Sequence, residues 1–240
     1  MKITILTLFK DMYDGFLNTS IISRVLAKGQ HEIKLVDIRD YSHDKHHHVD
    51  DTPYGGGAGM LMKVDIVHEA MMANKDEDTY VLLTSPKARP LTQKDLKRLS
   101  QKKNLMIVCG HYEGIDSRIE NYIDEKISIG DYILTGGELA SMVVTDGILR
   151  LLEESISSDS LVEESYENGL LEYPQYTRPV VYDGMEVPFV LTNGNHKDIN
   201  RYNLKMAISE TMKYRPELLD RELSELEKEL IKEINDELQK

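Results

Sequence analysis

Three motifs, each directly after an apolar run, hold residues that could support binding or catalysis: LLTSPKARP (82–90), CGHYEGIDSR (109–118) and SIGDYILTGGE (128–138). Ligands of open α/β sheets bind outside the carboxyl ends of strands. A helix predicted to begin at Glu138 adds a partial positive charge. The three loops could therefore converge on one small molecule. The alternative is that they are ordinary strand–helix turns, with Asp116 capping a helix.

A glycine-rich loop, YGGGAGM (54–60), comes earlier in the chain. Glycines let a backbone pass close to a phosphate or a base, and a helix predicted to begin near Met60 would offer free N–H groups. The loop lacks the Gly-Lys-Ser/Thr ending of a P-loop and the GxGxxG spacing of a dinucleotide site. It predicts contact with a phosphate or nucleic acid, or else a flexible turn.

A histidine cluster, HDKHHHVDD (43–51), has four His and three Asp in nine residues. Its ligands have no regular spacing, so a solvated loop is favoured over a metal site. Arg150 ends a predicted helix, where a positive charge complements the helix dipole. Glu164 is one carboxylate of an acidic segment. Pattern alone gives neither residue a function.

Strands and helices must alternate to position these motifs. Apolar runs predict strands over 2–9, 32–40, 79–84, 104–110 and 126–134, with Cys109 a small core residue. Helical spacing and caps predict helices over 11–28, 60–75, 93–102, 115–124 and 138–152. The alternation predicts an α/β fold with a mainly parallel sheet.

The composition is that of a soluble globular protein, with 40% hydrophobic and 30% charged residues among 240. A single Cys excludes a disulfide framework and cysteine-rich zinc sites. No apolar run approaches the roughly 18 residues of a membrane span, and Asp11 and Asp14 argue against a signal peptide. We therefore expect a cytoplasmic protein with no membrane partner.

The net charge of −13 would ordinarily argue against a nucleic-acid partner. Residues 153–172 hold seven carboxylates and no base, and residues 217–240 hold nine carboxylates against four bases. These stretches account for −7 and −5, so the rest is nearly neutral and compatible with a basic face.

The chain divides, on this pattern, into an α/β domain over 1–156, a mobile acidic linker over 157–167 and a small helical domain over 168–240. Helices are expected over 197–213 and 217–238, with no further strong strand.

Five ordered motifs resemble the bacterial tRNA (guanine-N1)-methyltransferase family, TrmD. They are DDTPYGGGAGM (50–60), CG-YEG-D-R, SIGDYILTGGE, GLLEYPQYTRP (169–179) and RPELL (215–219). Members are knotted SPOUT methyltransferases and homodimers that use S-adenosylmethionine to methylate N1 of guanine 37, next to the tRNA anticodon. The resemblance implies this activity, a trefoil knot in the first domain, a helical tRNA-binding second domain and an active site between subunits. Composition and periodicity alone would not predict a knot.

The resemblance also implies site residues. The methyl donor would be bound by Leu83, Thr84, Ser85, Pro86, Gly110, Glu113, Ser128, Ile129, Gly130, Asp131, Tyr132, Ile133, Leu134, Gly136 and Gly137. The anticodon stem-loop would be bound by Asp50, Tyr54, Gly55, Gly56, Gly57 and His196.

Guanine N1 carries a proton, so methylation needs a general base, and the charge that develops on O6 needs a cation. The family's base is the Asp of an Asp-Ser-Phe triplet, which corresponds here to Glu164-Ser165-Tyr166, with Asp159 and Glu163 as fallbacks. Arg150 corresponds to the catalytic Arg. Mg²⁺ is reported for the family, but the sequence has no evident metal cage; an ion held through water and substrate would leave little trace.

Two other functions remain open at this point. One is a SPOUT methyltransferase that acts on a ribose hydroxyl or another base, against which Glu164 and GLLEYPQYTRP argue. The other is a non-catalytic RNA- or nucleotide-binding dimer, which predicts no methyl-donor binding.

Overall fold

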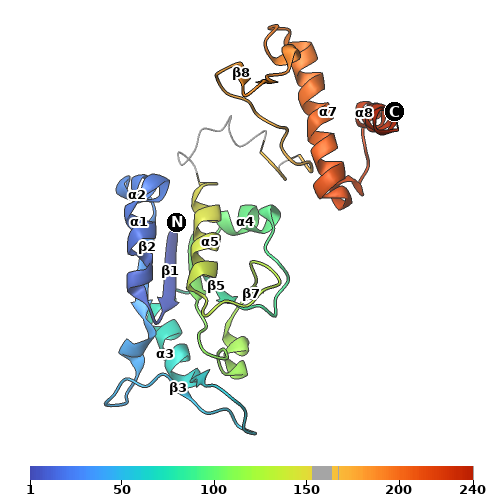
Figure 1. Cartoon of the computed structure of the whole chain (residues 1–240). Coiled ribbons are helices and arrows are strands. Elements are labelled where there is room, and N and C mark those ends of the chain that lie inside the picture. The colour runs from blue at the N-terminus through green and yellow to red at the C-terminus, as the bar shows by residue number, and fades with distance from the viewer. Residues whose placement is uncertain (153–163, 167, 240) are drawn as a thin grey trace. The chain divides into compact units, whose positions relative to one another are not determined.

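The structure is a computed structural model that describes residues 1–152, 164–166 and 168–239. It divides into two compact units, Met1–Ile156 and Ser157–Lys240, which are taken separately below (Figure 1). Most of the linker expected over 157–167 lies outside the described residues.

The first unit is built on a five-stranded sheet in the order β2-β1-β6-β5-β7, with every pair parallel. The strands are β1 (Lys2–Thr7), β2 (Glu32–Asp37), β5 (Thr79–Thr84), β6 (Asn104–Val108) and β7 (Glu125–Ile127). The α/β class with a mainly parallel sheet is therefore confirmed.

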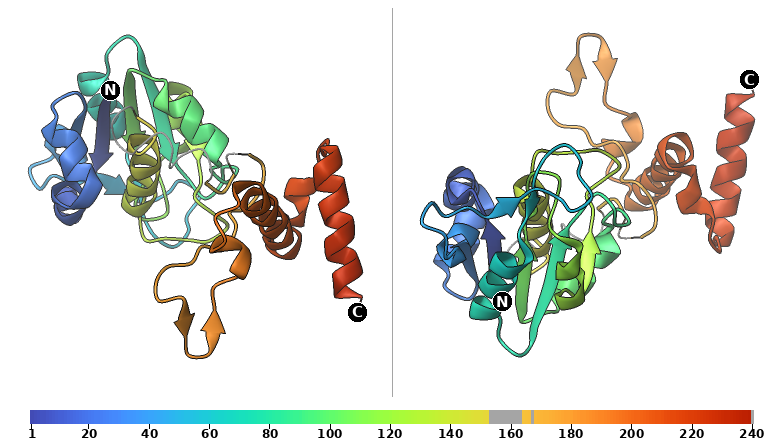
Figure 2. Two further views of the ribbon diagram at one scale, coloured as in Figure 1. Left: turned by 90° about the horizontal axis from the view of Figure 1, so that it is seen from above. Right: turned by 90° about the horizontal axis from the view of Figure 1, so that it is seen from below.

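Helices cover both faces of this sheet because successive strand residues point to opposite sides. The helices are α1 (Asp14–Asn18), α2 (Ser20–Ala27), α3 (Val64–Asn74), α4 (Gln93–Ser100) and α5 (Glu138–Leu149). Leu6 and Met106 pack with α3 on one face, while Ile5 and Ile107 pack with α2, α4 and α5 on the other. The two helical layers flank the sheet in Figure 2.

Short 3-10 helices and a two-stranded ribbon replace parts of the predicted elements. The 3-10 helices of this unit are Lys10–Tyr13, Ile38–Tyr41 and Ser117–Tyr122. The last of them covers most of residues 115–124, where an α-helix was expected. The predicted type of helix was therefore wrong there. The ribbon pairs β3 (Asp50–Asp51) with β4 (Leu61–Met62), so the helix expected from Met60 begins only at Val64.

Two further boundaries differ for local backbone reasons. The helix expected over 11–28 is interrupted where Thr19 is extended and Ser20 has a φ of 59°. It does end at Gly29, whose φ of 72° is that of a helix-terminating glycine, as the sequence predicted. The strand expected over 126–134 ends at Ile127, shortly before Gly130 turns the chain with a φ of 152°.

The second unit packs two helices, α7 (His196–Tyr214) and α8 (Glu225–Leu238). Its core is small: Leu170, Ala207, Ile208, Leu230 and Ile234. The helix expected over 217–238 is divided into a 3-10 helix (Pro216–Leu219) and α8, since Ser224 forms a capping box with Glu227 and starts a new helix.

A β-hairpin in this unit was not predicted. Strands β8 (Val181–Tyr182) and β9 (Met185–Glu186) pair across a turn in which Asp183 and Gly184 have φ of 49° and 75°. Figure 2 shows the hairpin extending from the rest of its unit, before the 3-10 helix Phe189–Leu191. The Asp-Gly pair is a strong hairpin signal in sequence. No helix in the described residues is long and apolar enough to cross a bilayer.

Candidate active site

Three loops meet at the carboxyl edge of the sheet, after the neighbouring strands β6, β5 and β7. The amide of Ser85 donates to the carbonyl of Ile127 (2.9 Å), which joins the first loop to the end of β7. The amide of Gly137 donates to the carbonyl of Gly110 (2.8 Å), which joins the third loop to the second. The parallel register thus brings together the three segments expected to bind the methyl donor.

The contact between Gly137 and Gly110 depends on the absence of a side chain. A Cβ on Gly137 would lie 2.9 Å from the Cα of Cys109 and 3.0 Å from the amide nitrogen of Gly110. These distances are too short for real carbon contacts with backbone atoms. The turn therefore requires glycine for the close approach of two backbones.

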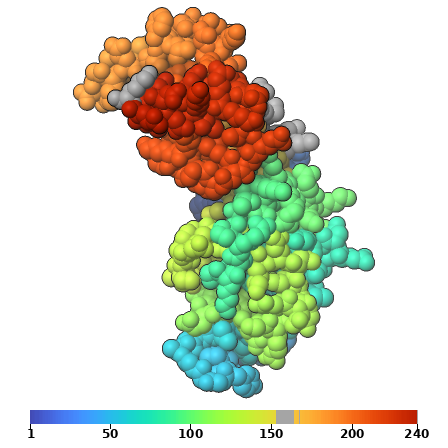
Figure 3. Space-filling view, turned by 90° about the vertical axis from the view of Figure 1, so that its right-hand side faces the viewer, coloured from blue at the N-terminus to red at the C-terminus, as the bar shows by residue number. Residues whose placement is uncertain are grey.

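The loop after β7 is held at its base and exposed at its tip. The hydroxyl of Ser128 donates to the carbonyl of Gly130 (3.0 Å) and accepts from its amide (3.2 Å). Tyr132, Ile133 and Leu134 are exposed apolar side chains. Figure 3 shows this yellow-green loop on the surface of the first unit. The exposed tip offers apolar surface that a planar ring could cover.

The glycine-rich loop lies against the second strand-end loop. The amide of Glu113 donates to the carbonyl of Met60 (3.0 Å), and the amide of Met62 donates to the carbonyl of Gly114 (2.9 Å). A Cβ on Gly59 would meet the carboxyl carbon of Glu113 at 2.9 Å. The structure thus brings the segment expected to bind tRNA next to Glu113, which is expected to bind the donor.

The remaining residues of the glycine-rich loop are open to solvent. Tyr54 is fully exposed. Gly55 and Gly56 have positive φ, and a methyl group added to either would meet no atom within 4 Å. Asp50 is half-buried in β3, which pairs with β4 directly after the loop.

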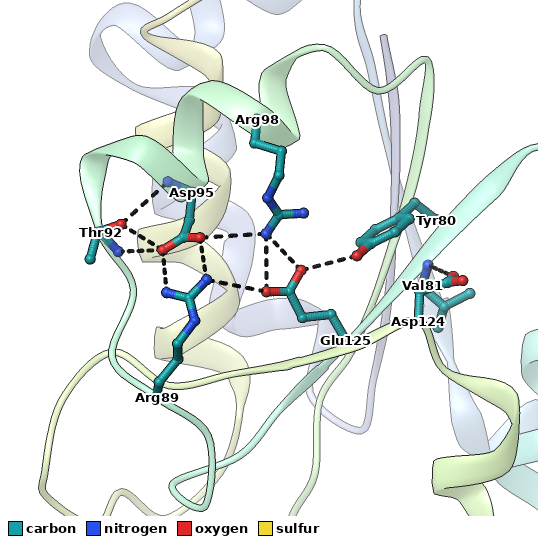
Figure 4. Close-up of polar contacts among 8 residues, drawn as sticks. All are labelled: Tyr80, Val81, Arg89, Thr92, Asp95, Arg98, Asp124 and Glu125. Carbon is teal, nitrogen blue, oxygen red and sulfur yellow. Dashed lines mark hydrogen bonds and ion pairs between the residues drawn. The ribbon is translucent and has the colours of Figure 1, made fainter.

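An ion-pair network supports the first loop (Figure 4). Arg89 donates to both oxygens of Asp95 (2.7 and 2.5 Å), and Asp95 forms a capping box with Thr92 at the start of α4. Arg98 connects this group to Glu125 of β7 (2.7 Å). The Arg89 guanidinium and the hydrogen bonds from Thr92 hold the pKa of the buried Asp95 carboxyl well below its ordinary value.

Arg150 and Glu164 lie in different units. Arg150 is the C-cap residue of α5 and is half-buried. Glu164 begins the Glu164-Ser165-Tyr166 triplet, which folds back on its own unit: the amide of Glu172 donates to the Ser165 hydroxyl (2.9 Å).

The end of the triplet is fixed by the same fold-back. The Tyr166 amide donates to the carbonyl of Leu170 (2.8 Å), and Arg215 donates to the Tyr166 hydroxyl (3.1 Å). His196, at the start of α7, is exposed. The fallback residues Asp159 and Glu163 lie outside the described residues.

The histidine segment makes pairwise contacts. His43 contacts Glu69 (2.8 Å) and His48 contacts Asp44. Within the described residues no group of three or more His, Cys, Asp or Glu side chains is arranged to hold a metal ion.

Comparison with known proteins decides the family. The model of the family described as tRNA (Guanine-1)-methyltransferase TrmD matches residues 1–221. This chain belongs to the TrmD family. A tRNA (guanine-N(1)-)-methyltransferase of Fusobacterium nucleatum is 47% identical to it over 239 residues, which are 99% of each chain. Proteins of the same name from Macrococcus caseolyticus and Dictyoglomus turgidum are 50% and 45% identical, over 92% and 99% of this chain and 92% and 98% of their own lengths.

Sequence reasoning within this TrmD-family chain missed the polar side chains beneath the loops. Glu138 was expected only to start a helix, but its side chain is 2% exposed and accepts from Thr7 of β1 (2.8 Å). Arg89 lies within the first motif, where pattern alone assigns it no role. Asp95, the partner of Arg89, belongs to the capping box with Thr92, a pattern that sequence analysis can recognise.

The Arg89–Asp95 network generates a stability prediction. Replacing Asp95 by Asn should lower the free energy of unfolding at pH 7 by about 1–3 kcal/mol, because the ion pairs of a buried carboxylate are lost and its half of the capping box is weakened. Arg89 is largely exposed, so solvent screening limits the effect. A carboxyl with a depressed folded pKa stabilises above its unfolded pKa of about 4 and loses that contribution as the pH falls further. The difference between wild type and D95N should therefore shrink below about pH 4.

Urea unfolding at pH 7 and at about pH 3.5 measures this difference. Asp76→Asn is the matched control, because Asp76 forms an exposed ion pair with Lys2 (3.2 Å) and should change stability little. Equal stability of D95N and D76N at pH 7 would refute the role of the network.

Proposed function

We propose that this protein transfers the methyl group of S-adenosylmethionine to N1 of guanine 37 in tRNA, in the cytoplasm. The observation that carries the proposal is similarity along nearly the whole chain to proteins named tRNA (guanine-N(1)-)-methyltransferase. The meeting of three strand-end loops at one sheet edge supports it, because such edges bind small molecules in α/β folds.

The three loops would hold the methyl donor, as residue correspondence with the family implies. Leu83 to Pro86, Gly110 with Glu113, and Ser128 to Leu134 with Gly136 and Gly137 would surround it, with the chain knotted at this edge. S-adenosylmethionine supplies an electrophilic methyl group when bound. The protein would contribute close backbone approach at Gly110 and Gly137 and apolar cover from the loop after β7.

The acceptor chemistry is assigned to Glu164 and Arg150. Glu164 would take the N1 proton as general base, which frees the lone pair that attacks the methyl carbon. Arg150 would stabilise the negative charge that develops on O6. Glu is one methylene longer than the family's Asp but has a similar reference acidity.

RNA contacts are assigned to the glycine-rich loop and to the second unit. Tyr54 and the glycines at 55–57 are exposed, as a surface that meets a nucleic acid must be. Asp50 and His196 would complete the contacts with the anticodon stem-loop. The family resemblance also implies Mg²⁺, but the described residues do not form a cage for it, so we assign no residue and no step to this ion.

The active unit is proposed to be a homodimer. Helix α5 buries Val144 and Ile148 in its own core, but Leu139 and Val143 on another face are 50% and 48% exposed. Met12 is also exposed. Apolar side chains one helical turn apart form a stripe that a second copy of the chain would cover. The active site would then combine Arg150 of one copy with Glu164 of the other.

The methyl-transfer proposal is tested with two tRNA transcripts. Labelled S-adenosylmethionine should label an unmodified transcript with G37 and leave the same transcript with A37 unlabelled, because adenine carries an amino group at C6 in place of the O6 on which Arg150 would stabilise negative charge. Label on both transcripts would move the target to another atom. No label on either, with donor in excess, would favour the non-catalytic binding module.

The general-base assignment is tested by Glu164→Gln. The amide cannot accept the N1 proton, so kcat should fall by about 10²–10⁴, with donor binding unchanged. Glu164→Asp, the family's residue, should retain far more activity, and Glu222→Gln, at an exposed position of the same unit, should behave as wild type. Full activity of E164Q in single-turnover assays would remove Glu164 from the mechanism.

The dimer is tested at α5. Val143→Glu places a charge in the exposed stripe and should shift sedimentation from dimer to monomer, with loss of methyl transfer. Met72→Glu is the control, because Met72 is equally exposed (54%) but lies on α3, which packs on the opposite face of the sheet. A wild-type monomer, or a V143E dimer, would contradict this interface.

A further inference from the structure

Glu138 is a buried carboxylate at the first position of α5, and nothing in the proposed reaction uses it. One carboxylate oxygen, Oε1, accepts from the Thr7 hydroxyl at the end of β1 (2.8 Å). The position suits an anion, since the free amides of a helix N-terminus carry a partial positive charge. Removing a carboxylate from water is costly, however, and one hydroxyl does not offset that cost. A further donor near the other oxygen, Oε2, is therefore expected.

The imidazole of His111 supplies a candidate donor. Among the described residues, the Nδ1 atom of His111 is buried and has no hydrogen-bond partner. Its ring packs against the rings of Phe9 and Tyr112, with centroids 4.9 Å from each. His111 also forms an antiparallel bridge with Gly136. A buried polar atom without a partner in so constrained a ring calls for an explanation.

Gly136 separates these two groups. A Cβ on Gly136 would lie 2.6 Å from Nδ1 of His111 and would overlap Oε2 of Glu138. Both atoms therefore border the volume that a methyl group on Gly136 would occupy. The φ of Gly136 is not in the left-handed region, so a side chain there would be opposed by the Glu138 and His111 side chains rather than by the backbone conformation.

We propose that His111 and Glu138 are positioning residues for the methyl-donor pocket. The Nδ1–H of His111, which has no direct partner among the described residues, donates to the Glu138 carboxylate through one water molecule, and this interaction fixes the Gly136–Gly137 turn against Gly110. The carboxylate selects the tautomer with the proton on Nδ1. The inference rests on the proposed function, because it assigns the turn to donor binding.

Three substitutions at His111 distinguish the contribution of the Nδ1 donor from that of ring packing. Asn places an amide nitrogen close to the position of Nδ1, Gln places one close to Nε2, and Phe keeps the ring contacts but has no donor. We expect H111N to keep the Kd and KM for S-adenosylmethionine within about 3-fold of wild type. We expect H111Q and H111F to raise both about 10-fold, the effect of one hydrogen bond to a charged group. The kcat at saturating donor should change less than about 2-fold in all three.

Calorimetric titration with S-adenosylmethionine, beside steady-state kinetics on the G37 transcript, gives these constants. Tighter donor binding by H111F than by H111N would show that ring packing, and not the nitrogen, matters, and would overturn the inference. Equal donor binding by wild type and all three variants would overturn this inference and leave the proposed function standing. A folded wild type that does not bind S-adenosylmethionine would remove the proposed function, and the inference with it.

A second pair of variants tests the inference even if substitutions at His111 prevent the protein from folding. Gly136→Ala adds a methyl group that would overlap both Nδ1 of His111 and Oε2 of Glu138, and it should weaken donor binding at least about 10-fold. Gly15→Ala, on α1, meets no atom within 4 Å and should bind as wild type. Equal donor affinity of G136A and G15A would overturn the pairing of His111 with Glu138.

Discussion

The amide of Gly137 donates to the carbonyl of Gly110 at 2.8 Å, and this contact joins the start of α5 to the end of β6. It exists only because Gly137 has no side chain at the point of closest approach. The positions of the buried polar side chains beneath this edge of the sheet depend on this contact. Glu138 and Ser141 are in the first turns of α5, so fixing Gly137 places Glu138 on Thr7 of β1 and Ser141 on Tyr13 (2.6 Å).

The buried polar layer under this edge has a structural role. The Tyr13 hydroxyl also lies 3.5 Å from the Cys109 thiol, and burial raises the pKa of Cys109 to about 12. A thiol that stays protonated is a poor nucleophile and a poor metal ligand. Cys109 is therefore the core residue that the sequence predicted.

The sheet and its loops were predictable because apolar runs such as 79–84 and 104–108 are local signals, and a parallel order puts their ends at one edge. Segments without a local signal of this kind could not be predicted from the sequence. The short strand β4 has only two residues and depends on pairing with Asp50–Asp51, across the glycine-rich loop. The placement of Glu138 against Thr7 and near His111 likewise joins distant residues, which periodicity does not encode. The family resemblance supplied Glu164 and Arg150, which pattern alone left as a solvated carboxylate and a helix-end charge.

Several acidic side chains of the second unit form ion pairs within that unit. Carboxylates of α8 pair with bases of α7: Arg201 contacts Glu229 (3.0 Å), and Lys205 contacts Glu237 (2.6 Å). Arg221 contacts the buried Glu227, and this contact with the Ser224 cap lowers the pKa of Glu227 to about 2. These charges hold two helices around a small core, where each ion pair adds to few apolar contacts. The net charge of −13 bears on solubility and on association kinetics, and it does not by itself exclude an RNA substrate.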